Sequence, residues 1–132
     1  MKQAQALHEF DTRRIVDYWL TEADESWQVA NHLVASGDYS YALFFGHLTV
    51  EKTLKALCAA RMEQHAPPIH HLLRLARLMG LEPDPIQAEA LLTITAFNIE
   101  ARYPDLKRAF RAQCTPEFTM HQMTLIKETL QW

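Results

Sequence analysis

Glycine is scarce in this chain, with only three residues in 132, at positions 37, 46 and 80. β-Sandwiches and barrels need many tight turns, and glycine is the residue that most readily supplies them. The scarcity therefore argues against a turn-rich β architecture. The length fits one domain with one hydrophobic core, so we predict a single domain over residues 1–132, with its core over about residues 12–130.

Three further features are sparse, and each excludes a class of protein. The two cysteines, Cys58 and Cys114, lack CxxC spacing, which favours two free thiols in a reducing cytosol. No apolar run approaches the ~18 residues of a membrane span, and the first residues lack the apolar core of a signal peptide. The formal net charge of −3 gives no general attraction to nucleic acid or anionic lipid. We therefore expect a cytoplasmic protein with no membrane partner.

Apolar residues recur at helical spacing in five segments. These segments cover about residues 12–35, 41–62, 69–79, 84–99 and 115–132. Asp11, Asp38, Asp84 and Thr115 precede four of them as candidate N-caps, because their side chains can accept from the unpaired N–H groups of a first helical turn. Short connections between such helices are typical of an all-α, up-and-down bundle of four to five helices.

The segment from Tyr41 to Met62 is apolar over most of its circumference, so it should be covered by several neighbours. The same helix nevertheless carries Glu51, Lys52 and Lys55 within about 100° of arc, with His47 beside Glu51. Two interpretations remain open. Glu51 and Lys55 can pair at a half-exposed rim, or the cluster can line a polar cleft.

No complete catalytic or metal-binding set occurs in the sequence. His70 and His71 are adjacent, so on a helix they point about 100° apart and cannot easily share an ion. A capping or packing role is the alternative for such loop histidines. The chain has neither a Gly-rich phosphate loop nor a nucleophile elbow. We therefore predict no metal site and no cofactor.

The Arg102-Tyr103-Pro104-Asp105 turn is distinctive. As a structural device, Arg102 and Asp105 can form an ion pair around the proline, with Tyr103 packed beneath. In the functional interpretation, Arg102 joins the basic cluster of Lys107, Arg108 and Arg111, which is suited to binding phosphate groups.

Four sequence pieces, taken in order, resemble the prokaryotic HEPN family over about residues 12–130. They are Tyr41-Ala42 with Phe45, Glu51-Lys52-x-x-Lys55-Ala56-Leu57, Pro67-Pro68-x-His70-His71-Leu72-x-x-Leu75 and Ala101-Arg102-Tyr103-Pro104-Asp105. The resemblance implies a four- or five-helix bundle that often forms homodimers. It also implies a frequent partner, a minimal nucleotidyltransferase (MNT), with which many HEPN proteins form toxin–antitoxin pairs.

Toxic HEPN proteins are metal-independent RNases whose site is an Arg followed by four to six residues and then a His. This chain departs from that motif, because three residues separate Arg61 from His65, eight separate it from His70, and nine separate Arg111 from His121. The missing spacing favours a role without enzymatic activity.

Three functional hypotheses follow. The first is a non-catalytic HEPN module that dimerises and pairs with an MNT protein, or binds a nucleotide or RNA phosphate in a polar cleft, or does both. Its candidate ligand-binding residues are Arg102, Tyr103, Glu51, Lys52, Lys55, His70 and His71. The second is an RNase with an atypical site, in which His47, His70 or His71 approaches Arg102 in three dimensions. The third is a purely structural interaction bundle.

Overall fold

The computed structural model describes residues 11–132, without the side chain of Ala101. Within that range the chain forms six α-helices, one short 3₁₀ helix and no strand, which confirms the all-α bundle. None of these helices is both long and apolar enough to cross a lipid bilayer. The predictions made for residues 1–10, including the missing signal peptide, lie outside the described residues.

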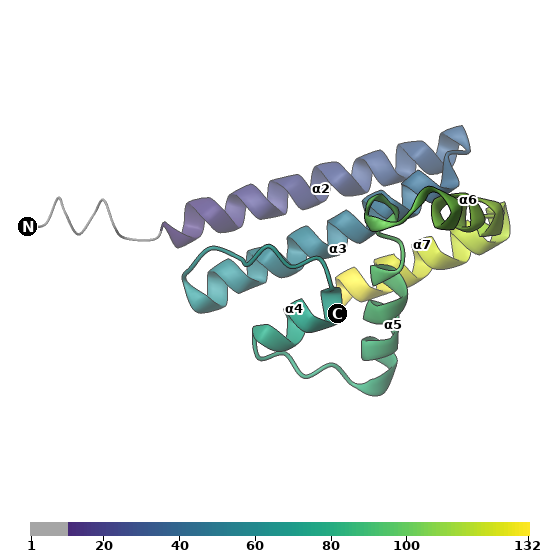
Figure 1. Cartoon of the computed structure of the whole chain (residues 1–132). Helices are drawn as coiled ribbons and strands as arrows, with labels where there is room; N and C mark the ends of the chain where they lie inside the picture. Colours follow the sequence, from purple (N-terminus) through teal and green to yellow (C-terminus); the bar gives the residue numbers. More distant parts are fainter. Residues whose placement is uncertain (1–10) are drawn as a thin grey trace, which may run out of the picture.

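Two long antiparallel helices, α2 and α3, run side by side, and the shorter helices pack on the other side of α3 (Figure 1). The elements are α2 (Thr12–Ser36), α3 (Tyr39–Met62), α4 (Leu72–Leu78), α5 (Pro85–Thr95), η1 (Ile99–Ala101), α6 (Pro104–Gln113) and α7 (Pro116–Gln131). Helix α3 contacts α2, α4, α5, α6, η1 and α7. Its predicted central position is therefore confirmed.

Helix starts follow local side-chain chemistry at three of the four predicted caps. Asp11 accepts from the Arg14 N–H at 3.2 Å, and Thr115 accepts from the Phe118 N–H at 3.1 Å. Asp84 and Gln87 form a reciprocal capping box with distances of 2.7 and 3.0 Å. The fourth prediction is confirmed in position but not in hydrogen bonding.

Asp38 occupies the N-cap position of α3 but makes no capping hydrogen bond with its side chain. Its carboxylate instead accepts from the Ser36 hydroxyl at 2.6 Å. The turn between α2 and α3 is short, so the hydroxyl at the end of α2 lies within reach of this carboxylate.

Helix α6 lies where the sequence analysis assigned only a basic stretch. Pro104 occupies its first turn, but the side chain of the N-cap Tyr103 makes no capping hydrogen bond. Phe110 is its single buried residue, although Leu106, Ala109 and Phe110 recur at the i, i+3, i+4 spacing of an apolar helical stripe. Helix α5 ends at Thr95 rather than near Ile99, and no glycine or proline follows Thr95 directly to mark this end in the sequence.

The core forms where α3 meets α4, α5 and α7. Its fully buried large side chains are Leu43 on α3, Leu72 and Leu75 on α4, Leu91 and Ile94 on α5, and Ile126 on α7. Gly46 lets α7 approach α3 closely, because a Cβ atom built there would lie 2.5 Å from Cδ1 of Ile126. This packing holds the polar arc of α3 in a fixed position.

Candidate functional site

A buried carboxylate organises the polar arc of α3. Glu51 is 4% exposed, and its Oε2 accepts from Nζ of Lys55, one helical turn later, at 3.2 Å. The predicted ion pair is thus confirmed. Its predicted place at a half-exposed rim is wrong, because Lys55 is only 6% exposed. Loss of hydration makes such a pair costly unless further partners satisfy both charges.

The loop before α4 supplies the second partner of Glu51. Nδ1 of His70 lies 2.9 Å from Oε1 of Glu51, so the ring donates to the carboxylate. The His70 side chain is 62% exposed, and its Nε2 atom has no partner among the described residues. A buried carboxylate therefore fixes an accessible imidazole whose second nitrogen is available for a further hydrogen bond.

Helix α2 closes the other side of this arrangement. Nζ of Lys52 donates to the buried hydroxyl of Ser26 at 2.8 Å, and the Lys55 ammonium lies 5.4 Å from the ring centre of Trp19. Both contacts join α3 to α2. The structure thus brings together Glu51, Lys55 and His70, with Lys52 alongside; with His47 we call these residues the polar cluster.

His47 is the most deeply buried member of the polar cluster, with no exposed surface. Its Nε2 lies 3.1 Å from the backbone carbonyl of His70 and donates to it, while Nδ1 is buried without a partner among the described residues. The ring also stacks on Phe44, with 6.4 Å between centres. Burial lowers the pKa of His47 below its ordinary value, an effect opposed by its hydrogen bond to the His70 carbonyl and by the nearby charge of Glu51.

Acidification is therefore expected to destabilise the fold through His47. In the unfolded chain this group takes up a proton near pH 6.5, but in the folded state only at lower pH. Between the folded and the unfolded pKa the unfolded state consequently binds more protons. As the pH is lowered through this range, His47 decreases the free energy of unfolding by up to about 1.4 kcal/mol per pH unit.

Urea unfolding of wild type and His47→Gln from pH 7.5 to 5 tests this expectation. The variant should show a shallower loss of stability below pH 6.5. His32→Gln, at an exposed position of α2, serves as the matched control and should retain the wild-type slope. Equal slopes in all three proteins would assign the pH dependence to other groups.

No side-chain hydrogen bond or ion pair among residues 11–132 joins the remaining predicted site residues to the polar cluster. His71 is the N-cap of α4, where its Nδ1 accepts from the Arg74 N–H at 3.3 Å. Its capping role is therefore the one observed. Tyr103 is 78% exposed, so it is not packed beneath the turn, and the structural interpretation of that turn is wrong for this side chain.

Arg102 is held by two contacts from its own end of the bundle. Its guanidinium donates to the carbonyl of Ala96 and lies 5.5 Å from the ring centre of Phe110. Among residues 11–132 it forms no ion pair with Asp105, so the predicted Arg102–Asp105 pair is wrong. The carbonyl and the ring satisfy the guanidinium instead. No hydrogen bond or ion pair in the described range joins it to His47, His70 or His71.

Sequence reasoning missed three parts of the site. Ser26 lies 26 residues before Lys52, and Trp19 is further still from the polar cluster, so only the pairing of α2 with α3 reveals them. The available signal was weak: a serine on an otherwise apolar helical stripe. The burial of His47 under the His70 backbone likewise depends on where the loop crosses α3.

Both cysteines are free and buried, which confirms the predicted thiols. Burial raises the pKa of Cys114 to about 11 and also raises that of Cys58. Neither thiol therefore carries the thiolate character that nucleophilic catalysis needs at neutral pH.

Comparison with known proteins agrees with the helical geometry. The model of the HEPN domain matches residues 16–128. The crystal structure of TT1696 from Thermus thermophilus is similar at 25% sequence identity and a TM-score of 0.60, over 86% of this chain and 97% of that one. No curated protein matches the chain. Since the HEPN model spans nearly the whole sequence, from α2 into α7, the chain belongs to the HEPN domain family.

Proposed function

We propose that this chain is a non-catalytic HEPN module of the cytoplasm that binds a nucleotide or RNA phosphate at the polar cluster. The observation that carries the proposal is the arrangement of Lys52 and His70 around the buried Glu51–Lys55 pair. Glu51 neutralises Lys55, which leaves Lys52 as the excess charge. An anionic phosphate fits that excess, with the exposed His70 ring as a neighbouring polar group.

The same proposal includes two protein partners. A homodimer and an MNT-type nucleotidyltransferase are both common associations of HEPN proteins, and membership of that family supports them here. Sedimentation velocity is expected to give twice the monomer mass of 15.3 kDa. A gene for a small nucleotidyltransferase next to this one would identify the second partner.

Binding to a labelled single-stranded RNA and to ATP tests the phosphate site. Affinity measured by fluorescence anisotropy should fall with salt, and Lys52→Ala should weaken it about tenfold, the loss expected for one hydrogen bond to a charged group. Lys127→Ala, at an exposed position of α7, is the matched control and should bind as wild type. Equal affinity of both variants would show that Lys52 does not contact the ligand. No measurable binding, with no thermal shift for a nucleotide panel, would favour a purely structural bundle.

An atypical RNase is the second candidate, and one contact favours it. The 2.9 Å bond from His70 to Glu51 orients an imidazole as a general base would be oriented. One observation argues against the RNase: Arg102 contacts the Ala96 carbonyl and the Phe110 ring rather than the His70 imidazole. RNA incubated with the protein in EDTA should stay intact. Cleavage that disappears in His70→Gln would establish the RNase and overturn the non-catalytic proposal.

A further inference from the structure

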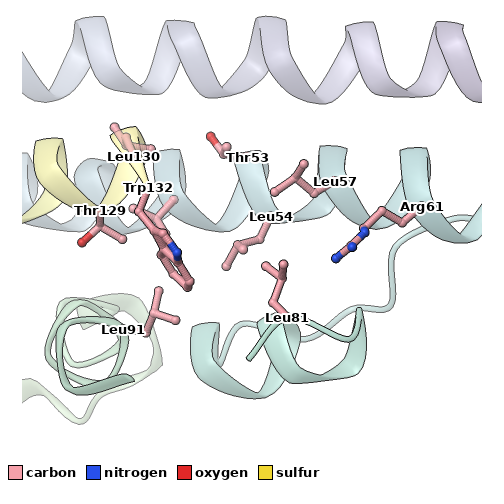
Figure 2. A pocket seen from close by; sticks show the side chains of 10 residues that line it. Thr53, Leu54, Leu57, Arg61, Leu81, Leu91, Thr129, Leu130 and Trp132 are labelled. Atoms are coloured by element: carbon pink, nitrogen blue, oxygen red, sulfur yellow. The ribbon is translucent and has the colours of Figure 1, made fainter. Parts of the chain in front are cut away.

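A cavity of about 340 Å³ opens between α3, α5, α7 and the turn after α4, and none of the polar cluster lines it (Figure 2). Its walls are mostly apolar: Leu54 and Leu57 from α3, Leu81 after α4, Leu91 from α5, and the indole of Trp132. The volume lies at the lower end of the range of small-molecule sites, which is roughly 300–1,000 Å³.

A single charged side chain lies at one end of this cavity. The guanidinium of Arg61 points from the last turn of α3 toward the space in front of Leu81, as Figure 2 shows. It makes no hydrogen bond or ion pair with any residue in the described range 11–132. All other residues that line the cavity have uncharged side chains. The cavity therefore combines a long apolar wall with one unpaired cation.

We propose that this cavity binds an amphipathic organic anion, a carboxylate with an unbranched apolar tail. The tail lies along the α3 face from Val50 to Leu57, and the carboxylate accepts from the Arg61 fork. From Val50 to Arg61 the helix rises about 16 Å, so the site is elongated rather than round. This site is separate from the proposed phosphate function and does not depend on it.

The wall chemistry selects against a nucleotide in the same place. A purine or pyrimidine buries several hydrogen-bonding groups, which need partners when they leave water. Thr53 and Thr129 supply the only side-chain hydroxyls among the lining residues. A saturated tail needs no such partner, and its burial is favourable in proportion to its length.

Titration calorimetry with the n-alkanoates hexanoate, octanoate and decanoate tests the site in the full chain. We expect saturable binding of one molecule per chain, tightened by up to about fourfold for each added methylene. Decanol and decyltrimethylammonium carry the same tail without the anionic head. They should bind about fivefold or more weakly than decanoate, because they lack the pairing with Arg61.

Two variants separate the head from the tail. Arg61→Gln should weaken decanoate about fivefold and leave decanol unchanged, while the exposed-surface control Arg14→Gln behaves as wild type. Leu57→Trp, at a wall position that is 42% exposed, should fill the mouth and abolish binding without changing the helical circular dichroism.

Other occupants would give different results. No saturable decanoate binding, or equal affinity for decanoate and decanol in wild type and Arg61→Gln, overturns the proposal. A dimer that Leu57→Glu converts to a monomer, with no binding of any alkanoate, assigns this face to a second copy and also overturns it. Decanoate binding by a wild-type protein that binds neither RNA nor ATP would overturn the phosphate proposal and leave this one standing.

Discussion

Replacing Glu51 by methionine is expected to lower the free energy of unfolding by about 3–5 kcal/mol, the cost of leaving one partner of a buried ion pair uncompensated. Methionine has a similar volume but no carboxylate, so the Lys55 ammonium would stay buried without an anionic partner among residues 11–132, beside the Trp19 ring. His70 would lose its acceptor too, but it is exposed and can bond to water. Urea unfolding at pH 7 measures the effect.

The double variant Glu51→Met/Lys55→Met is the control for this prediction. With both charges gone, two flexible apolar side chains occupy the same space, and the free energy of unfolding should return close to the wild-type value. Lys55→Met alone should cost less than Glu51→Met, since Glu51 retains His70 as a partner. A loss below about 1 kcal/mol in Glu51→Met would mean that water reaches the Lys55 ammonium.

Truncation of Ile126 to alanine is the second large effect, with an expected loss of about 2–5 kcal/mol. Ile126 is fully buried on α7, and its Cδ1 occupies the space that the missing side chain of Gly46 leaves on α3. Removal of the side chain forfeits its burial and leaves a cavity at the α3–α7 contact. Thermal and urea unfolding measure the loss, and Ile86→Ala, at a position 82% exposed, should change stability by less than about 0.5 kcal/mol.

A double-mutant cycle with Gly46→Ala tests the register of the two helices. In the wild type the new Cβ would meet Cδ1 of Ile126 at 2.5 Å, so the neighbour must move. In Ile126→Ala the same methyl group would partly fill the cavity. The two changes should therefore couple favourably by about 0.5–3 kcal/mol. Additive losses would show that α3 and α7 do not meet at this pair.

The degree to which the fold was predictable differs from helix to helix. The starts at Asp11, Asp84 and Thr115 were predictable because each depends on hydrogen bonds within three residues. Helix α6 was missed although Leu106, Ala109 and Phe110 recur at helical spacing, because its three basic residues were interpreted as a phosphate-binding stretch. The side chain of its N-cap makes no hydrogen bond that would mark the start, and its position follows from contacts with η1 and α3.

The candidate site shows the same division. The Glu51–Lys55 pair follows from i, i+4 spacing on one helix, and the structure confirms it. The link from Glu51 to His70 spans 19 residues and depends on the path of the loop before α4. Arg102 was predicted to join these residues because of the family motif. In the structure its guanidinium instead contacts the Ala96 carbonyl and the Phe110 ring.

By itself, the sequence determined the helical class, the central position of α3 and the charged arc upon it. The scarcity of glycine is a property of the composition, and apolar periodicity and capping residues are patterns within a few neighbouring positions. Only the tertiary structure decided that Glu51 is buried, that His70 reaches it, and that Arg61 faces an apolar cavity. These features need segments far apart in the chain to meet. Their positions follow from core packing between helices, which no local pattern specifies.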